Sequence, residues 1–424
     1  MSAGPVEPLQ LVRGRVAVVG GGLAAVSLVQ TLRAGGFVGA LSVLEAGPEP
    51  HDRPPLSKAY LAGRLGPDQL ALVPPTWWAE QSVDLRTGVR VEGLVRQADG
   101  SLVVLADGAE VPADRVVLAS GGRPRRPPVP GAEHALVLRD RVDADVLRDR
   151  LGPGHRLVVV GGGLVGSEVA ATALTLGCQV TVVDPQVPLT ALLGHELAVW
   201  LHLLHRERGV VLVADGVDRI ESGSVHVPGA VIPADTVLVA TGLLPEVPVV
   251  GVVPAGVEAG TPEAVGAVEV LTRTEDGAVL VDEAGRSSVP GVLAVGDCSG
   301  RSAGGRSAGH WDSARLDAEA AAAGLLGLPL PVRGPSWFWS DRHGHHLEVL
   351  GAPAAAEQLV TRGVVGEPPF SCFGLTGGRV VSAASVDDPA AVKVARRLAA
   401  LGTAVDPAAL ADPATDLRRL ARAR

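Results

Sequence analysis

Two glycine-rich segments with the same spacing are the residues of this chain best suited to chemistry. They are Gly20-x-Gly22-x-x-Ala25 and Gly161-x-Gly163-x-x-Gly166. Glycine permits a tight turn and a close approach to a pyrophosphate, whose charge then lies on the free N–H groups at the start of the following helix. One such pattern also occurs in ordinary turns of parallel sheets. Two patterns in one chain predict two dinucleotides, one that donates electrons and one that accepts them.

An acidic residue follows each glycine turn at the end of a second apolar strand. Glu45 ends the segment LSVLE, and Asp184 ends the segment VTVVD. A carboxylate at this position hydrogen-bonds the ribose of an adenosine. No arginine lies near Asp184 in the sequence, so a 2′-phosphate would meet an uncompensated negative charge. NADH is therefore expected rather than NADPH.

A second pair of segments extends the internal repeat beyond the glycines. VPADRVVLASGGRP (111–124) and IPADTVLVATGLLP (232–245) match almost residue for residue. Each begins at a turn and ends a strand with Ala-Ser/Thr-Gly. The repeat predicts two homologous Rossmann-type units, and these must position the glycines and the acids at the carboxyl ends of their strands.

Length and composition limit the possible class of protein. The chain has 424 residues and a net charge of −9, with 47% hydrophobic residues. We expect two or three domains and no general affinity for nucleic acid. No apolar run reaches the roughly 20 residues that span a bilayer, and the N-terminus has no pattern of a secretion signal. A cytoplasmic protein without a membrane segment is expected.

The three cysteines exclude one kind of electron transfer. Cys178, Cys298 and Cys372 are far apart and form no CxxC or CxxxxC motif. A flavoprotein that reduces disulfides needs a pair of thiols beside its flavin. We expect electrons to leave this protein by another route.

Local patterns predict the elements around the motifs. A strand at 16–20, a helix at 23–34 and a strand at 41–45 should open the first unit. Antiparallel strands are expected within 83–121, and the proline-rich segment 123–131 should be a linker. Further helices are expected at 313–326 and 389–401, and a tail that begins near residue 333 contains a strand with the sequence WFWSD.

Several of these segments together resemble a known family. HDRPPLSKAYL, GGGLVGSEVA, AVGDCS, GHWDSA and WFWSD are similar to FAD-dependent NADH:ferredoxin reductases of the rhodocoxin and putidaredoxin reductase type, which have a glutathione-reductase-like fold and supply bacterial oxygenases. The resemblance extends over nearly the whole chain. It implies an α/β protein with two Rossmann-type domains, for FAD and NAD, and a C-terminal α+β domain. The implied limits are 1–124 and 250–333 for FAD, 125–249 for NAD and 334–424 for the C-terminal reductase domain.

The resemblance also assigns cofactor-binding residues. Gly20, Gly22 and Ala24 would approach the FAD pyrophosphate, and Glu45 would bind the adenosine ribose. The other residues implied to contact FAD are Arg53, Lys58, Val91, Arg139, Asp297 and Trp311. For NADH, the implied set is Gly161, Gly163, Gly166, Asp184 and Gly242. This chain departs from the family in having Gly309, where an acid is common.

Lys58 and Glu168 are the residues that the resemblance places near the flavin N5 and the nicotinamide. A Lys/Glu pair can settle the charge that develops when a hydride moves, and it can orient the nicotinamide. Glu168 has an alternative interpretation as an acid in the first turn of a helix, where the macrodipole favours it. No metal ligand set is expected, because the histidines of the HGHH segment (343–346) have no cysteine or other ligand cluster near them.

The implied activity is electron transfer from NADH through FAD to an iron–sulfur ferredoxin, which serves a haem-thiolate monooxygenase or a Rieske dioxygenase. Two alternatives remain, an NADH oxidase or peroxidase and a flavoprotein like the apoptosis-inducing factor that responds to NADH. Trp311, Trp337 and Trp339 either pack a core or screen the flavin edge. A basic cluster is expected to steer an acidic ferredoxin. Its members are Arg301, Arg306, Arg315, Arg333, Arg342 and His343.

Overall fold

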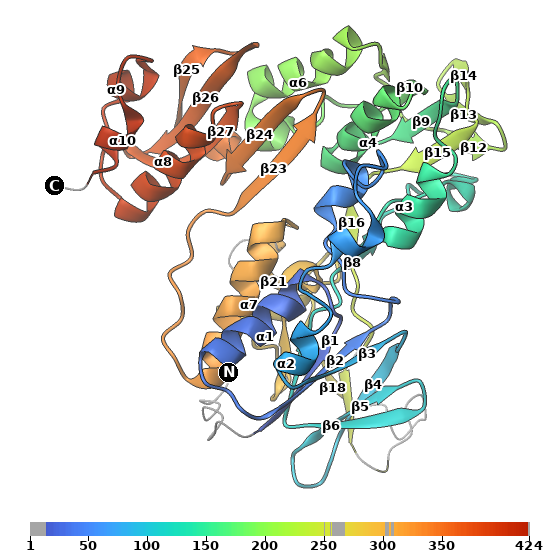
Figure 1. Cartoon of the computed structure of the whole chain (residues 1–424), viewed down its shortest axis with the longest axis vertical. Coiled ribbons are helices and arrows are strands. Elements are labelled where there is room, and N and C mark those ends of the chain that lie inside the picture. Colours follow the sequence, from blue (N-terminus) through green and yellow to red (C-terminus); the bar gives the residue numbers. More distant parts are fainter. Residues whose placement is uncertain are drawn as a thin grey trace. The chain divides into compact units, whose positions relative to one another are not determined.

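The computed structural model describes residues 14–249, 251–254, 256, 268–301 and 309–422, together with the backbone of 305–306. Internal contacts divide the chain into two units (Figure 1). The first unit comprises Met1–Asp52, Asp68–Arg123 and Leu243–Arg333, and the second comprises Arg53–Pro67, Pro124–Gly242 and Gly334–Arg424. Within the described residues, none of the helices has the length and apolar character needed to cross a bilayer.

A parallel sheet forms the centre of the first unit, and its strands follow the order β20-β7-β1-β2-β3. Their bounds are Val292–Ala294, Arg115–Leu118, Arg15–Val19, Ala40–Glu45 and Val83–Thr87. The helix α1 connects β1 to β2 and runs from Leu23 to Ala34, as the sequence predicts for 23–34. The predicted strands at 16–20 and 41–45 are confirmed to within one residue at each end.

Both faces of this sheet are covered, which explains why its strands are continuously apolar. Val16 and Val18 of β1 pack with α1 and with α7 (Trp311–Leu326), two helices that lie side by side in Figure 1. Ala17 and Val19 point to the opposite face and pack against a second sheet. The alternation of side chains along β1 thus joins two apolar clusters.

The second sheet of this unit has the order β18-β17-β4-β5-β6. Its strands are Glu269–Val270, Gly251–Pro254, Val91–Arg96, Leu102–Ala106 and Ala109–Ala113. Antiparallel pairing of β4, β5 and β6 confirms the prediction for 83–121 in its middle part. The prediction is wrong for the two ends of that segment, because β3 and β7 join the parallel sheet. The remaining elements of the unit are α2 (Trp77–Glu80), β19 (Val279–Val281), β21 (Ser299–Arg301) and β22 (Gly305–Arg306).

Two short strands, β8 (Gly122–Pro124) and β16 (Leu243–Pro245), pair where the chain leaves and re-enters the first unit. The rest of the predicted linker, as far as residue 131, contains no helix and no further strand.

The second unit repeats the parallel arrangement, with the order β11-β10-β9-β15. These strands are Val211–Val213, Gln179–Val183, Arg156–Val160 and Thr236–Val239. The helix α4 (Leu164–Thr175) follows β9 as α1 follows β1. Additional elements are α3 (Arg141–Arg148), α5 (Thr190–Leu193), α6 (His195–Glu207) and an antiparallel ribbon of β12 (Arg219–Glu221), β13 (Ser224–Val227) and β14 (Ala230–Pro233).

An antiparallel sheet from the C-terminal part of the chain completes this unit, with the order β23-β24-β27-β26-β25. Its strands are Trp337–Arg342, His345–Leu350, Arg379–Val386, Glu367–Thr376 and Gln358–Val364. One face packs on α8 (Pro389–Leu401), which coincides with the predicted helix at 389–401, and the shorter helices α9 (Pro407–Ala411) and α10 (Leu417–Leu420) join the same cluster. The other face packs on Leu197 and Leu201 of α6. The division into three domains stays a prediction, since these contacts group 334–424 with 124–242.

A glycine in the second fingerprint is required by packing rather than by its φ angle. A Cβ on Gly166 would lie 2.0 Å from the carbonyl oxygen of Gly161, so the helix α4 can approach the end of β9 only with glycine at this position. At Gly163, by contrast, a Cβ would have no other atom within 4 Å, and φ is −62°. The two glycines therefore have different reasons for their identity.

We expect Gly166→Ala to lower the free energy of unfolding by roughly 1–3 kcal/mol, because the added methyl group meets backbone that cannot move aside. Gly163→Ala is the matched control, and its cost should stay below about 1 kcal/mol. Urea unfolding followed by circular dichroism measures both. Equal losses for the two variants would contradict the packing argument.

Candidate active site

The carboxyl ends of β1 and β2 bring the first glycine turn together with Glu45. Gly20 has a φ of +103°, and a Cβ there would lie 2.5 Å from the carbonyl oxygen of Ala119, so only glycine fits. Gly22 is the N-cap of α1, with no side chain capping the helix and no acid in its first turn. Glu45 accepts hydrogen bonds from the backbone N–H of Gly21 at 2.5 Å and of Gly47 at 2.6 Å. The helix start is open and positive, as a pyrophosphate site requires.

Asp297 and Trp311 belong to the same end of the sheet. Asp297 follows β20 in a short 3-10 turn, and a Cβ on the adjacent Gly296 would lie 3.4 Å from the Cβ of Ala24. Trp311 is the first residue of α7, and its indole N–H donates to Asp52 at 3.1 Å. Gly20, Gly22, Ala24, Glu45 and Asp297 are therefore close together, and Trp311 begins the helix that packs beside α1.

Val91 has a different environment from the other predicted residues of this unit. Its side chain is buried in the apolar cluster between the two sheets. The predicted contact of Val91 with an adenine stays a prediction.

The second unit has the same arrangement at the carboxyl ends of β9 and β10. Gly161 has a φ of +100°, and a Cβ there would lie 2.6 Å from the carbonyl oxygen of Ala240. Asp184 accepts a hydrogen bond from the backbone N–H of Gly162 at 2.9 Å, as Glu45 does from Gly21. Gly163 is an uncapped N-cap, and Gly242, with a φ of +103°, follows β15 at the same end. Each acid thus fixes the middle glycine of its own turn.

Lys58 and Glu168 form an ion pair within the second unit. The Nζ of Lys58 lies 3.2 Å from Oε1 of Glu168, and their side chains are only 15% and 6% exposed. Ser57 donates its hydroxyl proton to Oε2 of the same carboxylate. Glu168 lies beyond the first turn of α4, which contains no acid, so the macrodipole interpretation of this residue is wrong.

A strand more than 160 residues away in sequence completes the surroundings of Glu168. Ser340 of β23 is fully buried and donates to Oε1 of Glu168 at 2.7 Å. The same hydroxyl accepts from Nη2 of Arg342 at 3.0 Å. Burial lowers the pKa of Arg342 to about 10, while Glu168 and Asp341 oppose that shift. The guanidinium is therefore charged at neutral pH.

The tryptophans of β23 lie on the opposite face of this strand from Ser340. Trp337 and Trp339 stack with their ring centroids 4.9 Å apart, and both are partly exposed. The ammonium group of Lys58 lies 5.8 Å from the centre of the Trp339 ring. Packing of the core is done by Phe338, which lies between them in sequence. The interpretation that the tryptophans pack a core therefore does not account for Trp339.

A basic cavity of about 520 Å³ adjoins this ion pair within the second unit. Lys58, Arg342, Arg64 and Arg208 line it, with Asp341 as its acidic member. Oδ2 of Asp341 lies 3.9 Å from Nζ of Lys58. The remaining lining residues come from the C-terminal half of α4, from the turn between β23 and β24 and from the start of β24.

Arg53 and Arg139 also belong to the second unit. Arg53 is exposed immediately before the turn that contains Ser57. Arg139 precedes α3, and its backbone N–H donates to Asp143 at 2.9 Å. Their assignment to FAD stays a prediction.

The prediction that these basic residues form a cluster of free positive charges is wrong. Arg301 and Arg333 both pair with the buried carboxylate of Asp317. Arg315 pairs with Asp312 at 2.7 Å and with Glu319 at 2.5 Å. Arg342 is only 4% exposed, and the side chain of Arg306 lies outside the described residues. Local acids thus neutralise three of these arginines, and burial removes a fourth from the surface.

The three histidines of the HGHH segment have other partners than a metal. Nε2 of His343 lies 2.8 Å from Nδ1 of His205, and burial lowers the pKa of His343 to about 4. His345 contacts Asp387 at 2.7 Å, and His346 contacts Asp341 at 2.6 Å. The described part of the chain contains no group of three or more residues that could bind a metal ion.

All three cysteines lie in the described residues as free, buried thiols. Burial raises the pKa of each of them. Cys298, the one in the first unit, is completely enclosed in the apolar cluster between the two sheets. Reactive cysteines need an exposed and stabilised thiolate, so none of these residues is suited to redox chemistry.

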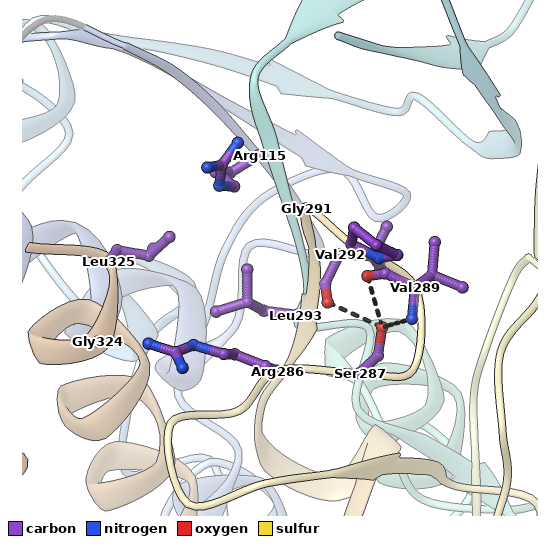
Figure 2. Close-up of a pocket in the computed structure, with 10 residues that line it drawn as sticks. Arg115, Arg286, Ser287, Val289, Gly291, Val292, Leu293, Gly324 and Leu325 are labelled. Carbon is purple, nitrogen blue, oxygen red and sulfur yellow. Dashed lines mark hydrogen bonds between the residues drawn. The ribbon is translucent and has the colours of Figure 1, made fainter. Parts of the chain in front are cut away.

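Figure 2 shows a second cavity, in the first unit, that is unsuited to a cofactor. It is lined by Arg115, Arg286 and Leu293, and the hydroxyl of Ser287 bonds the backbone of Val289 and Val292. Its volume is about 40 Å³, enough for little more than water. It also lies at the amino ends of β7 and β20, whereas open parallel sheets bind ligands at the carboxyl ends.

Ser57 and Ser340 were not predicted as site residues, and Arg342 was expected only as a member of the basic cluster. A signal was present, because a half-buried strand alternates its faces and WFWSDR places Phe338, Ser340 and Arg342 on one face. Two polar residues on the buried face of a strand indicate a polar partner across the interface. The sequence could not identify that partner as Glu168.

The fold and these two glycine turns define a class of oxidoreductases that bind two dinucleotides. The family model described as pyridine nucleotide-disulphide oxidoreductase matches residues 14–318, and a reductase C-terminal model matches 337–421. This chain belongs to the pyridine nucleotide-disulphide oxidoreductase family. It is an oxidoreductase of the type that uses FAD and NAD(H).

Similar proteins extend over almost the entire chain. The ferredoxin reductase component of chlorobenzene dioxygenase from Cupriavidus sp. (strain PS12) is 34% identical over 96% of this chain and 98% of its own length. Putidaredoxin reductase CamA from Pseudomonas putida is 31% identical over 96% of each chain. The crystal structure of the covalent putidaredoxin reductase–putidaredoxin complex contains a chain with a TM-score of 0.85 and 31% identity, which covers 96% of this chain and 98% of that one.

We expect Glu168→Gln and Lys58→Met each to slow the bleaching of the flavin by NADH by on the order of 100-fold, because the role predicted for this pair is to orient the nicotinamide and to balance charge as the hydride moves. Arg64→Met removes a positive charge from the same loop. It is the control, because Arg64 does not contact Glu168. Anaerobic stopped-flow absorbance measures the rate, and circular dichroism checks the fold. Wild-type rates in both variants would contradict the assignment.

Proposed function

We propose that this chain is a ferredoxin reductase that moves electrons from NADH through FAD to an iron–sulfur ferredoxin, which in turn supplies an oxygenase. The observation that supports this most is the combination of two open glycine turns with the burial of every cysteine. Two dinucleotides can exchange a hydride, while no pair of thiols is available to carry electrons onward. The names of the similar proteins, which are ferredoxin reductase components, support the choice of acceptor.

In this proposal, each of the two units binds one of the two dinucleotides. The first unit would bind FAD through Gly20, Gly22, Glu45 and Asp297, and the sheet of 124–242 would bind NADH through its own glycine turn. Bound FAD supplies the chemistry of accepting a hydride from NADH and releasing its electrons one at a time. Lys58 and Glu168 would orient the nicotinamide and balance charge, and Trp339, which covers Lys58, would limit the access of water.

The NADH oxidase or peroxidase alternative is disfavoured by Cys298. Those enzymes use a redox cysteine near the flavin, and the only cysteine of the first unit is fully buried with its pKa raised. A flavoprotein that acts as a sensor, like the apoptosis-inducing factor, would be reduced slowly and pass few electrons to ferredoxin. Kinetics separate these functions.

Anaerobic stopped-flow of the holoprotein tests the proposal. Mixing with NADH should bleach the flavin within milliseconds to seconds, at rates typical of enzymes. Addition of an oxidised 2Fe–2S or 3Fe–4S ferredoxin should restore the flavin colour far faster than oxygen does. NADPH at the same concentration is the control for Asp184 and should bleach more slowly.

Two outcomes would overturn the proposal. Fast bleaching without a response to ferredoxin would favour an oxidase or a sensor. Failure to bleach with NADH would contradict the assignment of Gly161, Gly163 and Asp184 to this nucleotide.

The basic cavity of the second unit is the surface we propose for an acidic ferredoxin, in place of the arginines of the first unit. Arg208→Glu should raise the apparent KM for ferredoxin several-fold at low ionic strength, with little effect at high salt, because screening removes the attraction. Steady-state reduction of ferredoxin by NADH measures this change.

Arg150→Glu makes the same change of charge on an exposed residue that does not line the cavity, and it is the matched control. Equal effects of the two variants would indicate that only net charge matters. Unchanged kinetics for Arg208→Glu would exclude the cavity as the docking surface.

We also propose that the protein is cytoplasmic. Three free thiols in one chain suit a reducing compartment, where NADH is available.

A further inference from the structure

Arg342 is a buried charge that the proposed mechanism does not use. It is 4% exposed, and its Nε has no hydrogen-bond partner among the described residues. Within that part of the chain it forms no ion pair, and its Nη2 donates to the hydroxyl of Ser340. A buried guanidinium is costly, and replacement of buried ions by apolar residues is often neutral or stabilising. The position of Arg342 therefore needs an explanation other than stability.

The hydroxyl of Ser340 links Arg342 to Glu168. It accepts from Nη2 of Arg342 at 3.0 Å and donates its only proton to Oε1 of Glu168 at 2.7 Å. Hydrogen bonds in such a chain polarise one another, so the guanidinium strengthens the bond that Ser340 donates. The same Oε1 also accepts from Lys58 at 3.2 Å.

The charges closest to Glu168 include that of Arg342. Two cations, Lys58 and Arg342, face two carboxylates, Glu168 and Asp341. Arg64, Arg208, His345 and His346 also line the cavity, and His346 contacts Asp341 at 2.6 Å. The pair of His205 and His343 lies close by, and burial lowers the pKa of His205 to about 3 and that of His343 to about 4. These two histidines are neutral at neutral pH, so they cannot replace the charge of Arg342.

We propose that Arg342 is a positioning residue which, through Ser340, keeps the buried carboxylate of Glu168 ionised and its Oε1 directed at Lys58. The residue acts on Glu168 from the C-terminal part of the chain. The kinetic part of this inference rests on the proposed function, whereas the state of the carboxylate can be measured without it.

Without the guanidinium, Glu168 would be a buried carboxylate with one cation fewer, so it would accept a proton more readily. The test compares Arg342→Gln, which removes the charge and can still donate to Ser340, with Arg342→Lys, which keeps the charge. Ser340→Ala removes the hydroxyl that links Arg342 to Glu168 and leaves the charges of both residues in place. Arg150→Gln removes an exposed cation that does not line the cavity, and it is the matched control.

Infrared difference spectra of the holoprotein between neutral and acid pH are the first readout. In Arg342→Gln and Ser340→Ala, the band of a protonated carboxyl group should emerge at a pH higher than in the wild type by about one unit. The band should be absent when Glu168→Gln is added to Arg342→Gln. Arg342→Lys and Arg150→Gln should match the wild type.

The second readout is the pH profile of flavin bleaching by NADH. Arg342→Gln, which loses the charge, and Ser340→Ala, which loses the link, should both slow at acid pH where the wild type does not, whereas Arg342→Lys should keep the wild-type profile. Identical spectra and profiles for Ser340→Ala, Arg342→Gln and the wild type would overturn the inference, even if stability fell. If Arg342→Gln does not fold, Ser340→Ala gives the same decision. A shifted carboxyl band without any bleaching by NADH would support Arg342 and refute the proposed function.

Discussion

A carboxylate inside a protein must be paired, and this constraint determines how the second unit is built around Glu168. Its neighbours come from two distant parts of the chain, namely Ser57 and Lys58 from the end of a short 3-10 turn and Ser340 from an edge strand. Each partner needs its own support. Thr172 of α4 donates to the backbone of Ser57 at 2.8 Å, and the C-terminal sheet is fixed by its apolar contacts with α6. Pairing one charge therefore requires the loop, the helix and the C-terminal sheet to fold as a unit.

The two dinucleotide turns depend on a similar hydrogen bond to a carboxylate. In each, a carboxylate accepts the N–H of the middle glycine, at 2.5 Å for Glu45 and at 2.9 Å for Asp184. The acid at the end of the second strand thus fixes the turn as well as presenting oxygen to a ribose. Repetition of this contact in both units shows that the internal sequence repeat extends to details of geometry. It also explains why neither helix start carries a side-chain cap, since a cap would occupy the donors that a pyrophosphate needs.

The sequence predicted the parallel sheets, their glycine turns and the helices at 23–34 and 389–401, because those depend on local periodicity and turn chemistry. It did not predict which strands of 83–121 would leave the antiparallel sheet, since strand pairing is decided by long-range packing. It placed Lys58 beside Glu168 only through resemblance. Ser340 was missed, and Arg342 was expected only in the basic cluster, because strand alternation shows that a polar residue is buried but gives no information on what it contacts.

The position of the basic surface was predicted wrongly from the sequence for a similar reason. Sequence clusters count arginines along the chain, whereas the field at a surface depends on what neutralises each one in space. Asp317 pairs with both Arg301 and Arg333, which come from either side of it in sequence. Arg64 and Arg208, which no cluster predicted, line a cavity whose acidic member, Asp341, already contacts Lys58 and His346. On a chain with a net charge of −9, such a local excess is what an acidic electron acceptor could recognise. Since the cavity adjoins Lys58, attraction of the acceptor and orientation of the nicotinamide would depend on the same few residues.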